Sequence, residues 1–72
     1  MDNVHIETAG TTMKRRDIIR KLEQAGFIAL EGGNHTKLQH PDGRRTIVGR
    51  HGEIPSGTVR AIEKQTKVRL LE

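Results

Sequence analysis

The chain has 72 residues and a mass of 8.1 kDa, which is room for one small domain, and its apolar residues, 32% of the total, can build only a modest core. This length excludes a multidomain enzyme, and the absence of cysteine excludes disulfide-stabilised folds, thiolate metal sites and cysteine nucleophiles. The net charge of +4 is concentrated in residues 13–50, which carry +5, and this favours an anionic partner such as a nucleic-acid backbone.

The N-terminal residues 1–12 show no helical or strand period, and we predict an extension there, followed by a single domain over residues 13–72. The longest apolar run, residues 27–30, is far shorter than the roughly 18 residues of a membrane helix. The N-terminus also lacks the basic start and apolar middle of a secretory signal. We therefore expect a cytoplasmic protein with no membrane contact.

A first helix is predicted from Arg15 to Ala25. The apolar residues of this segment recur at the spacing of one helical stripe. Asp17 lies near the start, where the helix dipole favours a carboxylate, and Gly26 can take the left-handed conformation that ends a helix. The residues of the stripe are Ile18, Ile19, Leu22 and Ala25.

Three short strands are predicted next. Residues 27–31 are apolar and end at Gly32-Gly33, a corner between strands, with Phe27 expected in the core. In residues 35–40, Leu38 is expected to point inward, which places His35 and Lys37 together on the outer face. Pro41-Asp42-Gly43 predicts a turn, and residues 44–49 resume as a strand that completes a hairpin.

A polar link over residues 50–53 precedes a second helix that opens with Ile54-Pro55-Ser56, buries Val59, Ala61 and Ile62, and ends at Gln65 or Thr66. For the tail, residues 67–72, a helix end, a short strand and a loose segment remain open. The order is therefore α-β-β-β-α, an α+β fold with a three-stranded antiparallel sheet covered on one face by two helices. The other face, with His35, Lys37 and Arg45, is left to solvent or a ligand.

His35 is the main candidate for chemistry. It follows Gly32-Gly33-Asn34, a corner where a phosphate can approach the backbone closely. An imidazole has an ordinary pKa of about 6.5, so it can take or give a proton near neutral pH, including the proton of an RNA 2′-hydroxyl. An ordinary exposed histidine at a strand start is the alternative interpretation.

Other kinds of site have less support. His40 is expected to pack or cap the hairpin, and His51 lies in the polar link. Because His40 faces away from His35, a metal site built from His35, His40, Asp42 and His51 is not expected. Ser56 is expected to cap the second helix, and the carboxylates are scattered over different elements. With one aromatic residue, Phe27, reading of single-stranded RNA by stacking is not expected. We therefore predict no metal ion and no cofactor.

Five segments, taken in order, resemble the HicA toxin family, which consists of small ribonucleases of toxin–antitoxin pairs. The resemblance runs from about residue 13 to residue 65. It departs at Asn34, where serine is frequent, and at Leu38, where an aromatic residue is common. The segments are residues 13–20, 22–27, 32–35, 40–45 and 53–59.

The resemblance implies a fold like the double-stranded-RNA-binding domain and metal-independent cleavage of mRNA. The histidine after the glycine-containing turn, His35 in this sequence, would be the catalytic residue. The expected partners are mRNA and a HicB-type antitoxin protein that covers the site, and the free toxin is expected to be monomeric and to arrest growth.

Lys37, on the same face as His35, is expected to stabilise phosphate charge, and Gly33 and Asn34 to lie against the phosphate. Contacts to the RNA backbone or to the antitoxin are expected from Arg15, Arg16, Arg44 and Arg45, for which a solvated basic surface is the alternative. A non-catalytic RNA-binding module of the same fold is the alternative function. A helix-turn-helix DNA-binding protein is disfavoured because strands separate the two helices.

Overall fold

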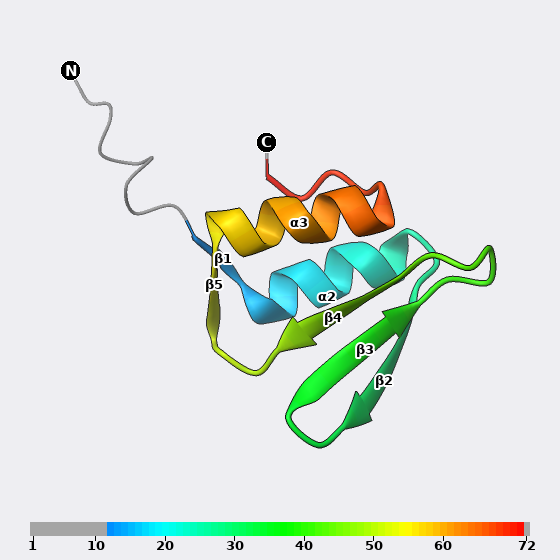
Figure 1. The fold of residues 1–72 in the computed structure, drawn as a ribbon, viewed down its shortest axis with the longest axis horizontal. Coiled ribbons are helices and arrows are strands. Elements are labelled where there is room, and N and C mark those ends of the chain that lie inside the picture. Colours follow the sequence, from blue (N-terminus) through cyan, green and yellow to red (C-terminus); the bar gives the residue numbers. More distant parts are fainter. Residues whose placement is uncertain (1–11, 72) are drawn as a thin grey trace.

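The computed structural model describes residues 12–71, which form an α+β domain. Strands β2, β3 and β4 make a three-stranded antiparallel sheet in chain order, and β1 pairs with β5 in a two-stranded antiparallel ribbon (Figure 1). The elements are β1 (Thr12–Lys14), α2 (Arg15–Gln24), β2 (Ile28–Gly32), β3 (His35–Gln39), β4 (Arg45–Gly49), β5 (Glu53–Pro55) and α3 (Ser56–Thr66).

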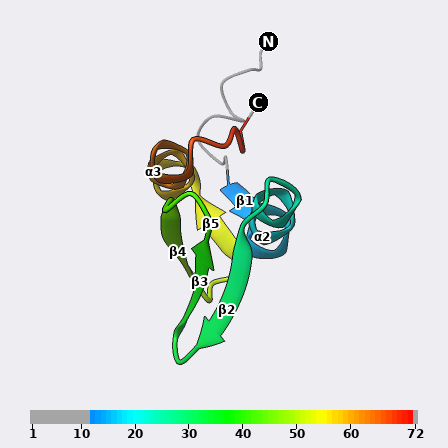
Figure 2. The same cartoon turned by 90° about the vertical axis from the view of Figure 1, so that its right-hand side faces the viewer.

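Both helices lie on the same side of the three-stranded sheet, and the β1–β5 ribbon lies between them (Figure 2). The burial pattern agrees, because alternate residues of β3 and β4 point toward the helices and are buried while their neighbours are exposed. The predicted α-β-β-β-α order, with one covered and one open sheet face, is therefore confirmed. None of the helices in the described part of the chain is long and apolar enough to cross a membrane.

Glycines determine where α2 and the hairpins end. Gly26 follows α2 with a φ of 101°, and a Cβ atom there would lie 2.9 Å from Nε2 of His40, so both the backbone and the space require glycine. Gly33, with a φ of 55°, takes the first position of the two-residue loop between β2 and β3. Gly43, with a φ of 102°, closes the predicted turn between β3 and β4.

One apolar core lies between the helices and the sheet, and it contains most of the residues predicted for it. Ala25 and Ala61, however, are exposed. Ala25 lies past the last turn of α2, and Ala61 is about 200° around the helix from Val59, away from the buried stripe. The buried apolar residues are Ile18, Leu22, Phe27, Leu38, Val48, Ile54, Val59, Ile62 and Leu70.

The β1–β5 ribbon was not predicted. Thr12, assigned to the N-terminal extension, begins β1, and residues 1–11 lie outside the described part of the chain. Glu53, assigned to a polar link, pairs with Lys14, while Ile54 and Pro55, assigned to the second helix, belong to β5. Strands of three residues are too short to show an alternating pattern, and this pairing joins segments that are distant in sequence.

The ends of α3 also differ in detail from the prediction. Pro55 holds the N-cap position and Ser56 is the first helical residue, so the predicted capping role of Ser56 is wrong. The helix ends at Thr66, as predicted, and residues 67–71 form an irregular segment that folds back on the domain. The carboxylate of Glu63 accepts the backbone N–H groups of Leu70 at 2.6 Å and Leu71 at 2.7 Å, and Leu70 is buried.

Candidate active site

The open face of the three-stranded sheet carries nine positions in three cross-strand rows. They hold two cations and one histidine, and none of the nine is a carboxylate. Three large apolar side chains on this face, from Ile28, Leu30 and Ile47, are between 45% and 58% exposed. The rows are Gly32–His35–Gly49, Leu30–Lys37–Ile47 and Ile28–Gln39–Arg45.

His35 begins β3 and is exposed between two glycines. Its cross-strand partners are Gly32 on β2 and Gly49 on β4, so there is bare backbone on both sides of the imidazole. A Cβ atom on Gly32 would meet nothing within 4 Å, which leaves space for a substrate group beside the ring. Lys37 follows on the same face, about 6.7 Å further along the strand, as predicted.

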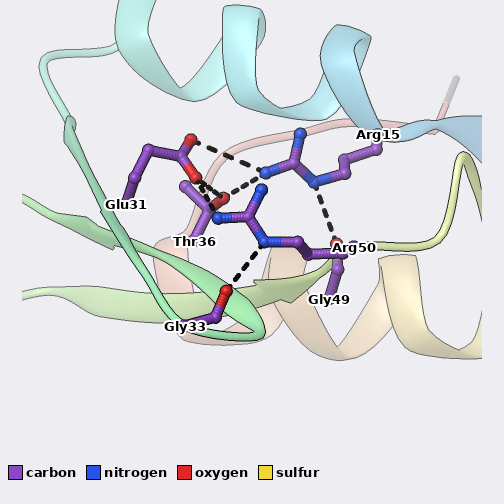
Figure 3. A network of polar contacts seen from close by, with 6 residues as sticks. All are labelled: Arg15, Glu31, Gly33, Thr36, Gly49 and Arg50. Carbon is purple, nitrogen blue, oxygen red and sulfur yellow. Dashed lines mark hydrogen bonds and ion pairs between the residues drawn. The ribbon is translucent and has the colours of Figure 1, made fainter.

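A polar network behind His35 joins the start of α2 to all three strands (Figure 3). Thr36 is fully buried, and its hydroxyl donates to the Glu31 carboxylate at 3.0 Å and accepts a hydrogen bond from Arg15. The guanidinium of Arg15 also donates to the carbonyl of Gly49 at 3.0 Å and lies 3.7 Å from Glu31. These contacts hold the side chain of Thr36, the residue next to His35, and the backbone of Gly49, the cross-strand partner of His35.

Arg50 holds the loop that precedes His35. Its Nε donates to the carbonyl of Gly33 at 3.0 Å, and its Nη2 donates to Glu31 at 2.7 Å (Figure 3). The sequence analysis placed Arg50 in a polar link and missed this role. No local signal identifies it, because the contact joins residues 17 apart through the register of the hairpins.

A protein-family model described as the HicA toxin of bacterial toxin–antitoxin matches residues 15–68, well over half of the chain. The chain belongs to the HicA toxin family. The matched range includes His35, both hairpins and every residue of the network around Glu31. A search of curated proteins finds no match for the chain.

Two of the four arginines expected to contact RNA or the antitoxin are engaged inside this HicA-family domain. Arg15 belongs to the network described above, and its side chain is 21% exposed. Arg44 donates to the carboxylate of Asp42 at 2.7 Å and to the carbonyl of Thr66, and its guanidinium lies 5.2 Å from the centre of the Phe27 ring. Both arginines therefore hold parts of the fold together.

Arg16, Lys37 and Arg45 are exposed, and within residues 12–71 none of them has an ion pair or a side-chain hydrogen bond to another residue. Lys37 and Arg45 line a hollow of about 460 Å³ at β4, together with Gln39 and Ile47 from the open face and Thr46 and Gln65 from the helix side. Arg16 lines a second hollow of about 360 Å³ at the beginning of α2, together with Lys14, Arg15, Arg50 and Gly52. Both hollows are within the size range of ligand sites.

The structure also shows where the remaining candidate residues lie and whether they form a metal site. Gly33 and Asn34, expected to lie against a phosphate, form the exposed loop immediately before His35. His40 packs as predicted, with its ring centre 5.1 Å from that of Phe27 in an edge-on arrangement. In the part of the chain that the structure describes, no three side chains of histidine, aspartate or glutamate come close enough together to hold a metal ion.

The carboxylate of Glu31 lies at the centre of the network, and its contacts favour the ionised form. The hydrogen bond from the Thr36 hydroxyl is the main reason that the pKa of Glu31 is lowered, and the guanidinium groups of Arg50 and Arg15 lower it further. Backbone N–H groups lower the pKa of Asp42 and of Glu63 in the same direction.

These three lowered pKa values predict a loss of stability in acid. The unfolded chain binds more protons than the folded one as the pH falls. The stabilisation from these three carboxylates is therefore fully present above about pH 5 and is lost between about pH 5 and pH 3. Thermal unfolding followed by circular dichroism should show a falling midpoint over this range. The Glu31→Gln variant should melt lower than the native protein at neutral pH and lose less on acidification. A native thermal midpoint that stays constant down to about pH 3 would contradict the lowered pKa values of these carboxylates.

Proposed function

We propose that this HicA-family toxin is an endoribonuclease that cleaves mRNA without a metal ion or cofactor, with His35 as its catalytic residue. The observation that carries the proposal is the exposed imidazole between Gly32 and Gly49, on a sheet face with two cations and no carboxylate at its nine positions. RNA brings its own nucleophile, the 2′-hydroxyl. The protein therefore needs to supply only acid–base groups and positive charge.

In the proposed reaction, His35 takes the proton of the 2′-hydroxyl or gives a proton to the leaving 5′-oxygen. The 2′-oxygen attacks the adjacent phosphorus, so that a P–O2′ bond forms and the P–O5′ bond breaks. The products are a 2′,3′-cyclic phosphate and a 5′-hydroxyl. Lys37, about 6.7 Å along β3 from His35, would stabilise the negative charge that develops on the phosphorus oxygens.

Single-stranded RNA is proposed to follow the open face from His35 across the larger hollow. Lys37 and Arg45 would hold phosphates, and Ile47 gives an apolar surface against which a base can lie. The amides of Gln39 and Gln65 can hydrogen bond to base edges, and Thr46 fixes Gln65 by donating to its side-chain oxygen at 2.5 Å. This mode of binding requires no aromatic stacking.

A HicB-type antitoxin is the proposed protein partner of the toxin, which we take to be monomeric when free. Membership of a toxin–antitoxin family supports a neutralising partner. The exposed apolar side chains of Ile28, Leu30 and Ile47 surround Lys37 on the open face, and a protein that buried them would also cover His35. Neutralisation would then follow from exclusion of RNA.

A non-catalytic RNA-binding module is the second candidate function, and the same cationic face favours it. Incubation of the purified protein with a long single-stranded transcript in excess chelator separates the two. Cleavage that leaves 2′,3′-cyclic phosphate ends supports the ribonuclease, whereas retention of intact RNA supports the binding module. Cleavage that stops when chelator is added would refute the metal-independent reaction.

A further inference from the structure

His51, in the link between β4 and β5, lies beside the candidate active site. A Cβ atom placed on Gly49 would be 3.8 Å from Cδ2 of His51, so this imidazole lies over the open face at Gly49. Gly49 is the cross-strand partner of His35, and the Cβ positions of such a pair project from one face about 4.5–5.5 Å apart. The imidazoles of His35, at the start of β3, and of His51, in the link after β4, therefore both lie near Gly49 on the open face.

Gly49 places no side chain between the two histidines, both of which are exposed. A phosphate placed over the backbone of Gly49 would have an imidazole on each side. The carbonyl of Gly49 accepts a hydrogen bond from Arg15 at 3.0 Å, so the backbone at this position is held in place.

We propose that His35 and His51 act as a general acid–base pair on RNA. One imidazole takes the proton of the 2′-hydroxyl as the P–O2′ bond forms, and the other, protonated beforehand, gives its proton to the 5′-oxygen as the P–O5′ bond breaks. This inference rests on the proposed ribonuclease function and completes it, since one imidazole cannot remove one proton and donate another in the same step. Proton exchange with water returns both groups to their starting states.

The charged groups around the pair are mostly cationic. Lys37 follows His35 on β3, and the second hollow brings Lys14 and Arg16 from the beginning of α2 next to Arg50 and Gly52, the neighbours of His51. Two carboxylates lie nearby, and both are paired: Glu31 with Arg50 and Arg15, and Glu53 with Lys14 at 3.9 Å. This surplus of positive charge favours a phosphate between the two imidazoles.

The test is the pH dependence of RNA cleavage by the native protein and by the His35→Ala, His51→Ala and His40→Gln variants. The native rate should fall on both sides of an optimum. The His35 and His51 variants should each lose about 10²-fold or more and one limb of the profile, and they should lose opposite limbs. The His40→Gln control, which changes a histidine away from the open face, should keep both limbs.

A substrate whose 5′-oxygen is replaced by sulfur identifies the acid, because a thiolate leaves without a proton. Either the His35 or the His51 variant, and not both, should recover most of its rate on this substrate. A His51→Ala variant that is as fast as the native protein, or that is slow with both limbs intact, would overturn the pair while leaving His35 as the catalytic residue. If the His51→Ala variant unfolds, the His51→Gln variant takes its place in the test. Native protein that leaves RNA intact would overturn both the acid–base pair and the proposed ribonuclease function.

Discussion

The His35→Ala variant is expected to cleave RNA about 10²–10⁴-fold more slowly than the native protein and to lose the ability to arrest growth. The imidazole is the only side chain in its cross-strand row, because both partners are glycines. No neighbouring group of that row can replace it. The measurement is the initial rate of cleavage of a long transcript, together with the growth of cells in which the variant is induced.

The same variant should keep its fold. His35 is exposed, and the network that holds its hairpin uses the side-chain hydroxyl of Thr36 and not the imidazole of His35, so the thermal midpoint should match that of the native protein. Lys37→Ala is the matched control on the same strand face, and it should weaken RNA binding and slow cleavage less than His35→Ala does. A His35→Ala protein that still cuts RNA and stops growth would remove His35 from the mechanism.

The face on which His35 lies could be predicted from the sequence because strand alternation is a local property. Leu38 and Thr36 are buried and His35 and Lys37 are exposed, and a period of two needs only a few residues to show itself. Gly26 and Gly43 could be assigned for a similar reason, since each takes the positive φ that its place at a helix end or turn requires.

The position of His51 and the roles of the arginines could not be predicted, because they depend on contacts between distant segments. Arg15 and Arg16 are adjacent in a basic run and look alike in the sequence. Only the pairing of the strands brings Glu31, Thr36 and Gly49 to one of them. His51 comes to the site in the same way, through the register that places Gly49 opposite His35.

The contrast between Arg15 and Arg16 gives the prediction with the largest effect on stability. Arg15→Ala removes hydrogen bonds from the hydroxyl of Thr36, which is fully buried, and from the carbonyl of Gly49. The expected loss is about 1–3 kcal/mol in the free energy of unfolding. For a domain of this size, each kcal/mol lowers the thermal midpoint by about 4–8 °C, so the change is readily measured by circular dichroism.

Arg16→Ala removes the same charge from the next residue and should leave the midpoint unchanged, because Arg16 is exposed and has no partner within residues 12–71. Its effect should instead fall on RNA binding, measured by fluorescence anisotropy on a His35→Ala background that prevents cleavage. Loss of one phosphate contact should make the dependence of log Kd on log salt less steep by about 0.7 for a single strand. Equal midpoints for the two variants, or a lower midpoint for Arg16→Ala alone, would mean that the network around Glu31 does not stabilise the fold as its contacts indicate.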